Sequence, residues 1–162
     1  MVITISGTPG AGKTSCAKLL AKKLGFEYYG VGARLRAMQG SPHVEKGQDR
    51  QIDDYTVPND TVIDGRLAYN FFPESFKVYL HCDVETAAKR ISEDDRDSEK
   101  HVTVQEVVSR REYDKQRYMQ EYNLDYTDVT QYDLVIDTTN LNITQTTELI
   151  IDKIHKTFNR LN

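Results

Sequence analysis

The chain has 162 residues, a formal net charge of −4 and two cysteines. The length suits one domain with its own core, and no run of Lys or Arg exceeds a pair, so the basic stripe typical of nucleic-acid binders is missing. No apolar run approaches the ~20 residues of a membrane span, and the first residues lack a signal-peptide layout. Cys16 and Cys82 have neither metal-site nor disulfide spacing. We expect a monomeric cytoplasmic protein, one domain over residues 1–162, without nucleic-acid or membrane partners.

The first part of the chain alternates β-forming segments with glycine-containing turns. In order, we expect a strand at 2–5, a helix at 13–24, a strand at 26–29, a short helix at 33–39, a helical piece near 49–55 and a strand at 61–64. Gly25 provides the stop for the first helix.

The second part continues the same alternation. We expect a strand at 76–81, a helix from the N-cap Asp83 through Ile91, a long helix from the capping box at Thr103 to about Tyr122, a strand at 133–137 and a last helix capped by Asn142. The charged segment EDDRDSEKH separates the first two of these helices. Strands that alternate with helices predict an α/β fold, with a five-stranded parallel sheet and helices on both faces.

One segment carries a specific chemical signal. GTPGAGKT, which is Gly7, Thr8, Pro9, Gly10, Ala11, Gly12, Lys13 and Thr14, fits the phosphate-loop pattern G-x-x-x-x-G-K-[ST]. Its glycines let backbone N–H groups turn toward phosphate oxygens at the positive end of the following helix. We expect Lys13 to reach the β- and γ-phosphates and the Thr14 hydroxyl to coordinate Mg²⁺, with Ser15 also at the nucleotide. No Asn-Lys-x-Asp segment is present to read guanine, so ATP is favoured.

Arginines follow two of the predicted strands. Arg36 lies on the short helix after the second strand, and Arg66 follows the third. Both strand ends should face the edge of the sheet that holds the phosphate loop, so the pair could bind a second phosphate group. Either arginine alone could equally be a surface residue. Asp64 could orient a Mg²⁺-bound water, or it could simply form the turn before Gly65.

The long helix carries a third group of charges. Arg110, Asp114 and Arg117 are spaced i, i+4 and i+7 and lie on one stripe at the margin of the apolar face. The side chains of such a stripe can face a cleft, but they can also form an ordinary exposed ladder of ion pairs, which contributes little to stability.

These residues belong to a set of segments in a recognisable order. After the phosphate loop come GARLR, DGRLAY, FFPESFKVYLHCD, ETAAKRI, RREYDKQRY and YDLVIDTTN. The chain thereby resembles the cytidylate kinases, a family of nucleoside-monophosphate kinases, and most closely their compact archaeal type. The resemblance weakens between residues 37 and 59, and its most specific parts are DGR and the helix R-x-x-x-D-x-x-R.

The resemblance implies a P-loop kinase fold with an acceptor-binding helical insert at about 31–59 and a short lid at about 92–102. It implies transfer of the γ-phosphoryl group of ATP–Mg²⁺ to CMP or dCMP. Under it, Arg36 and Arg66 hold the acceptor phosphate, and Arg110 and Arg117 close over both nucleotides. Asp114 orients Arg110 or the acceptor sugar, Arg90 and Arg96 carry positive charge to the donor phosphates, and residues 137–140 lie beside the adenine.

The base-reading residue is less defined. Bacterial members follow the motif arginine with an Asp, where this chain has Leu67. Arg50 and Asp53 are therefore the candidates for base selection, although each could equally be a charge on a helix surface.

Two alternative functions stay open. The chain could be a kinase for another small acceptor such as AMP, UMP, shikimate or dephospho-coenzyme A, or a nucleotide-dependent switch or assembly ATPase.

Overall fold

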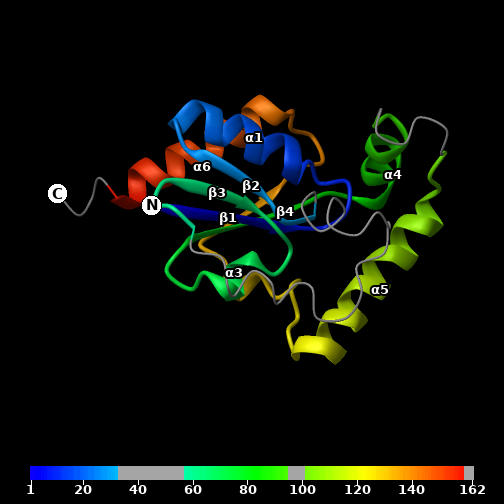
Figure 1. Cartoon of the computed structure of the whole chain (residues 1–162). Coiled ribbons are helices and arrows are strands. Elements are labelled where there is room, and N and C mark those ends of the chain that lie inside the picture. The colour runs from blue at the N-terminus through cyan, green and yellow to red at the C-terminus, as the bar shows by residue number, and fades with distance from the viewer. Residues whose placement is uncertain (33–56, 95–100, 159–162) are drawn as a thin grey trace.

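The computed structural model describes residues 1–32, 57–94 and 101–158 of the chain (Figure 1). Its elements are β1 (Val2–Gly7), α1 (Lys13–Leu24), β2 (Glu27–Gly30), β3 (Thr61–Asp64), α3 (Ala68–Phe71), β4 (Phe76–His81), α4 (Val84–Ser92), α5 (Val104–Tyr122), the 3-10 helix η3 (Val129–Gln131), β5 (Leu134–Asp137) and α6 (Ile143–Phe158). The helices predicted at 33–39 and 49–55 lie outside the described residues, as does most of the predicted lid.

The strands form one sheet in the order β2-β3-β1-β4-β5, and neighbouring strands pair in parallel. The predicted five-stranded parallel sheet is therefore confirmed. In the register, Ile5 of β1 pairs with Asp64 of β3 and with Val78 of β4. The carboxyl ends of the three central strands therefore reach the same edge, where ligands bind in open α/β sheets.

Helices cover both faces of the sheet, as predicted. α1 and α6 pack side by side on one face, and α3 lies on the other (Figure 1). Between the sheet and α1/α6, the fully buried side chains of Ile5, Leu20, Leu80 and Ile150 belong to one apolar cluster. α5 extends along the side of the molecule beyond the sheet edge and packs against α4 (Figure 1).

Local sequence signals fix the helix ends. Gly25 adopts a left-handed conformation (φ 71°) at the end of α1, where a side chain would be strained. At the start of α5, the Thr103 hydroxyl accepts from the backbone N–H of Glu106, whose carboxylate accepts from the N–H of Thr103, so the predicted capping box is confirmed. The predicted caps at Asp83 and Asn142 are also present.

Two short elements were not predicted. α3 has four residues and η3 has three, which is too few for a hydrophobic period to be recognised. β2 begins one residue later than expected, and β1 continues into the first glycine of the phosphate loop. None of the described helices is long and apolar enough to cross a membrane.

Candidate nucleotide site

The phosphate loop lies at the carboxyl edge of the sheet, between β1 and α1. A side chain at Gly7 (φ 139°) would overlap the carbonyl oxygen of Leu80 in β4, and one at Gly10 (φ 78°) would collide with Ala87 in α4. These two glycines therefore allow the loop to lie directly against β4 and α4 in a conformation that other residues rarely adopt. Gly12, also left-handed at φ 82°, leads into the first turn of α1.

Lys13 folds back over the loop that precedes it. Its Nζ donates a hydrogen bond of 2.7 Å to the carbonyl oxygen of Thr8. Desolvation and the nearby charge of Arg66 lower the pKa of Lys13 from 10.5 to about 7, with Arg110 acting in the same direction, while Asp64 and Asp114 oppose the shift. Four predicted site residues therefore lie close enough to Lys13 to influence its pKa: Arg66, Arg110, Asp64 and Asp114.

The two residues expected at Mg²⁺ lie in contact. The Thr14 hydroxyl donates to Oδ2 of Asp64 at 2.6 Å, and the Tyr28 hydroxyl lies 3.4 Å from the same oxygen. A hydroxyl and a carboxylate are oxygen ligands of the kind that Mg²⁺ prefers, and they stand beside the point where phosphates would enter the loop. The donor set therefore fits a Mg²⁺ ion that is shared with nucleotide phosphates.

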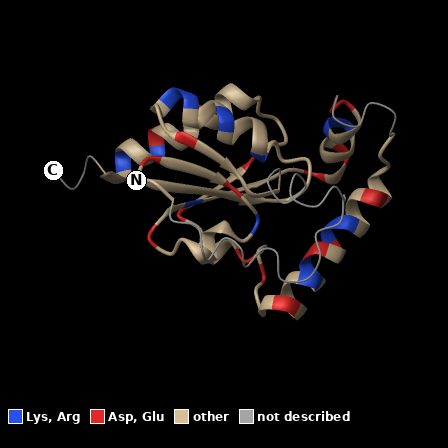
Figure 2. Cartoon of the chain, in the orientation of Figure 1, with Lys and Arg blue, Asp and Glu red and all other residues tan. Residues whose placement is uncertain are grey.

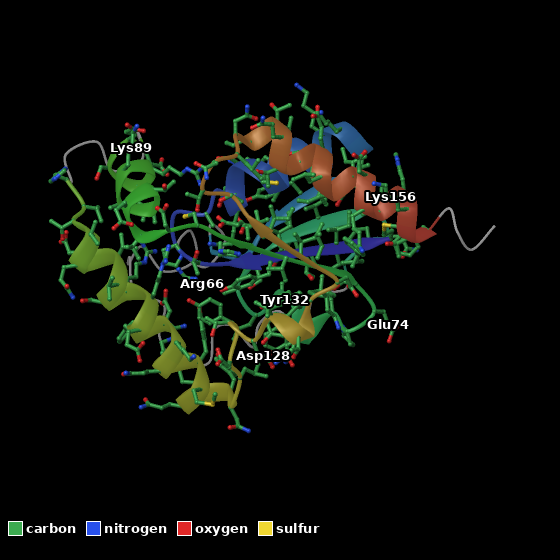
Figure 3. All side chains as sticks on the ribbon, turned by 180° about the vertical axis from the view of Figure 1, so that it is seen from behind. Arg66, Glu74, Lys89, Asp128, Tyr132 and Lys156 are labelled. Atoms are coloured by element: carbon green, nitrogen blue, oxygen red, sulfur yellow. The ribbon has the colours of Figure 1, made fainter. Side chains whose placement is uncertain are left out.

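Arg66 joins the sheet edge to α5. Its Nη2 lies 3.1 Å from Oδ2 of Asp114, and their side chains are 20% and 7% exposed. The backbone beneath Arg66 is held as well, because the Ser6 hydroxyl donates to the Arg66 carbonyl at 2.6 Å. Ser6 Oγ also lies 3.2 Å from the Tyr132 hydroxyl, which donates to the carbonyl oxygen of Tyr126 at 2.8 Å. Figure 3 shows Arg66 and Tyr132 on the same side of the sheet, toward α5.

The helical stripe is exposed only in part, because Asp114 is buried and Arg117 is partly buried, whereas Arg110 is exposed. Asp114 pairs with Arg66. That it orients Arg110 or the acceptor sugar, as the resemblance implies, stays a prediction. Arg117 lies over the Tyr118 ring, 4.9 Å from its centroid, with its Nε 3.6 Å from the Glu121 carboxylate. Arg110 is close enough to Lys13 to lower its pKa. Lys and Arg alternate with Asp and Glu along the length of α5 (Figure 2).

Arg90 has a role that the sequence did not suggest. Its Nη1 lies 3.1 Å from the Thr138 hydroxyl, and its Nη2 donates to the carbonyl oxygens of Thr138 and Leu141 at 2.7 and 3.1 Å. In this structure the guanidinium therefore holds the segment after β5. The Thr138 hydroxyl also lies 3.2 Å from the carbonyl oxygen of Ala11, so the segment expected beside the adenine is attached to the phosphate loop.

One residue of this edge was missed. Arg111, next to Arg110, points its Nη2 at carbonyl oxygens of the phosphate loop and of the end of β4. A charged residue on the helix surface gives no sequence signal for such a contact, because its partners lie far away in the chain. Four other candidates fall outside the described residues: Arg36, Arg50, Asp53 and Arg96.

Comparisons with known proteins agree with this geometry. The model of the cytidylate kinase-like family matches residues 41–140, and that of the AAA family of ATPases matches residues 3–55, which include the phosphate loop. The cytidylate kinase of Methanocaldococcus jannaschii is 31% identical to the chain, over 88% of this chain and 91% of its own length. That of Methanocella arvoryzae is 30% identical, over 96% of this chain and 99% of its own length.

A different relative matches only through part of its length. An S-adenosylmethionine-dependent nucleotide dehydratase from Lacinutrix mariniflava is 31% identical over 95% of this chain, but the chain spans only 36% of that protein.

Solved structures support the fold. The shikimate kinase of Acinetobacter baumannii has a TM-score of 0.67 at 18% identity, with 97% of this chain and 94% of the other covered. A deoxyadenosine kinase from M. mycoides has a TM-score of 0.62 at 17% identity, covering 96% and 100%. The architecture is thus that of the P-loop kinases. Together with the family match and the archaeal relatives, it establishes that the chain is a nucleotide kinase and belongs to the cytidylate kinase-like family.

Proposed function

We propose that this chain transfers the γ-phosphoryl group of ATP to CMP or dCMP, giving ADP and the nucleoside diphosphate. The observation that carries the proposal is the Arg66–Asp114 pair, which stands at the same sheet edge as the phosphate-loop lysine. A guanidinium fixed at that point suits an acceptor that brings its own phosphate. The relatives named cytidylate kinase supply the choice of base.

The residues take distinct roles in this proposal. The phosphate loop binds the donor phosphates through its N–H groups, and Lys13 compensates the charge that builds up on the transferring group. Arg66, together with Arg36, binds the acceptor phosphate, and Asp114 holds Arg66 in place. Arg110 and Arg117 lie over the two phosphate sites on α5.

Mg²⁺ would be held by Thr14 and Asp64 together with the nucleotide phosphates. When bound, it would neutralise phosphate charge and fix the donor geometry. Most of the rate enhancement then comes from alignment of the two substrates and from charge neutralisation rather than from a general base.

An acceptor panel tests the proposal. The purified protein is given ATP, MgCl₂ and one of CMP, dCMP, UMP, AMP, shikimate or dephospho-coenzyme A, and ADP formation is followed in each case. We expect kcat/KM to be highest for CMP or dCMP. Higher kcat/KM for AMP or shikimate would replace the acceptor assignment while leaving the kinase assignment intact.

The match to AAA ATPases over residues 3–55 favours one second candidate, a nucleotide-dependent switch or assembly ATPase. Its behaviour would be ATP hydrolysis that no nucleoside monophosphate changes. The same panel separates the two functions, because a kinase produces ADP in proportion to phosphorylated acceptor.

A further inference from the structure

α5 carries two of the residues proposed to act on the substrates, Arg110 and Arg117, yet it lies at the side of the sheet (Figure 1). Its buried contacts with the rest of the described chain include Val107 near α4 and Tyr118 in a cluster of aromatic residues toward its carboxyl end. Between these two points the helix passes the phosphate loop. The arginines of α5 can act on a phosphoryl group only if the helix is held there in a fixed position.

Arg111 reaches across this interval. Its Nη2 lies 3.0 Å from the carbonyl oxygen of Cys82, 3.4 Å from that of Asp83 and 3.5 Å from that of Pro9. Three carbonyl oxygens from two separate segments therefore converge on one nitrogen. Since a guanidinium is a donor only, carbonyl oxygens are the partners that suit it.

The contact with Pro9 adjoins the contact of Lys13. Lys13 donates to the carbonyl oxygen of Thr8, and Arg111 points at the carbonyl oxygen of the next residue. Two basic side chains, one from α1 and one from α5, thus contact consecutive peptide groups of the phosphate loop. A shift of α5 would pull on the same backbone that positions Lys13.

We propose that Arg111 is a positioning residue for phosphoryl transfer. It fixes α5 against the phosphate loop and the end of β4, and so sets the position of Arg110 and Arg117 relative to Lys13. The effect on turnover rests on the proposed kinase function, whereas the effect on the loop does not. The residue itself need not touch either substrate, because its side chain is directed at backbone carbonyls.

Two variants and one control test this role. Arg111→Met removes the charge and keeps an extended apolar stem, and Arg111→Lys keeps the charge but not the planar fork. Lys115→Met is the matched control, since it removes a cation of the same helix that pairs instead with Asp125 at 3.1 Å. Steady-state kinetics with the best acceptor of the panel are combined with hydrogen–deuterium exchange of the substrate-free protein.

For Arg111→Met we expect kcat to fall by on the order of 10- to 100-fold, with the KM for ATP changed less than about threefold, because misalignment weakens the transition state more than binding. Arg111→Lys should recover part of kcat, and Lys115→Met should stay within about twofold of wild type. In Arg111→Met, peptides from residues 7–15 should exchange faster, while peptides from α6 should not.

Three results would overturn the proposal: an unchanged kcat, a lower kcat without faster exchange of the loop, or faster exchange throughout the protein. The last would mean that Arg111 only stabilises the fold. If the wild type phosphorylates no acceptor, the proposed function fails, but the exchange measurement still decides whether Arg111 holds the loop.

Discussion

Replacement of Asp114 by Asn probes the joint between α5 and the sheet edge. Asp114 is 7% exposed in its side chain and faces the Arg66 guanidinium at 3.1 Å. Removal of one partner from a fully buried ion pair costs about 3–5 kcal/mol. Because Arg66 keeps 20% exposure and Asn retains an oxygen acceptor, we expect a smaller loss, about 1.5–3 kcal/mol, as for an interaction with a charged group that is not fully buried.

For a chain of this size, that loss corresponds to a fall of about 3–12 °C in Tm. Urea unfolding of wild type, Asp114→Asn, Arg66→Met and the double variant gives the coupling free energy of the pair, which should exceed about 1 kcal/mol. Lys115→Met is the control. Its pair with Asp125 is 45% and 29% exposed, so its removal should cost at most about 1 kcal/mol.

The kinetic counterpart is specific to the acceptor. Once Asp114 no longer holds Arg66, the KM for the acceptor should rise several-fold more than the KM for ATP. The reasoning is refuted if Asp114→Asn unfolds within about 0.5 kcal/mol of wild type, or if the two KM values rise equally. The first result would mean that the buried pair does not stabilise the joint, and the second that it does not orient the acceptor site.

Three further predictions concern Lys13, Arg117 and Thr14. Lys13→Met should lower kcat by on the order of 10²–10³-fold. It should also resist urea better than wild type near pH 7, because burial lowers the folded pKa of Lys13 to about 7 while the unfolded lysine stays protonated up to about pH 10.5; the difference should therefore shrink by pH 9.5. Arg117→Ala should lower kcat by on the order of 100-fold. It should also lower the unfolding free energy by about 1–3 kcal/mol, because its pair with Glu121 is only 20% and 14% exposed and its guanidinium lies over the Tyr118 ring. Thr14→Val should raise the MgCl₂ concentration needed for half-maximal rate by about tenfold and leave the acceptor KM unchanged, as measured by Mg²⁺ titration.

The local signals of the sequence predicted most of the described fold. Caps such as Thr103 and Asn142, and the left-handed stop at Gly25, act within one turn of the chain, so residue type alone defines them. The phosphate loop is equally local, because its shape depends on glycines in one continuous segment. The parallel sheet, too, was predicted from the alternation of strands and helices, whereas the order of its strands was not.

The partners of the arginines could not be read in the same way. Arg66 pairs with a residue 48 positions later, and Arg90 binds carbonyl groups some 50 positions away. Arginine has a long flexible side chain with several donors, so many acceptors are compatible with one sequence position. Carbonyl acceptors add a further difficulty, since every residue has one, and the contacts of Arg111 therefore leave no pattern in residue types.

The charges around Lys13 lead to a last prediction about nucleotide binding. Desolvation and the fields of Arg66 and Arg110 hold its pKa at about 7, so in the substrate-free protein near pH 8 the lysine is largely neutral. Phosphates that enter the loop bring negative charge close to the same nitrogen and raise its pKa again. Binding of ATP at pH 8 should therefore take up close to one additional proton relative to Lys13→Met, as calorimetry in two buffers of different ionisation enthalpy would measure. Equal proton uptake by the two proteins would show that Lys13 is already protonated before ATP arrives.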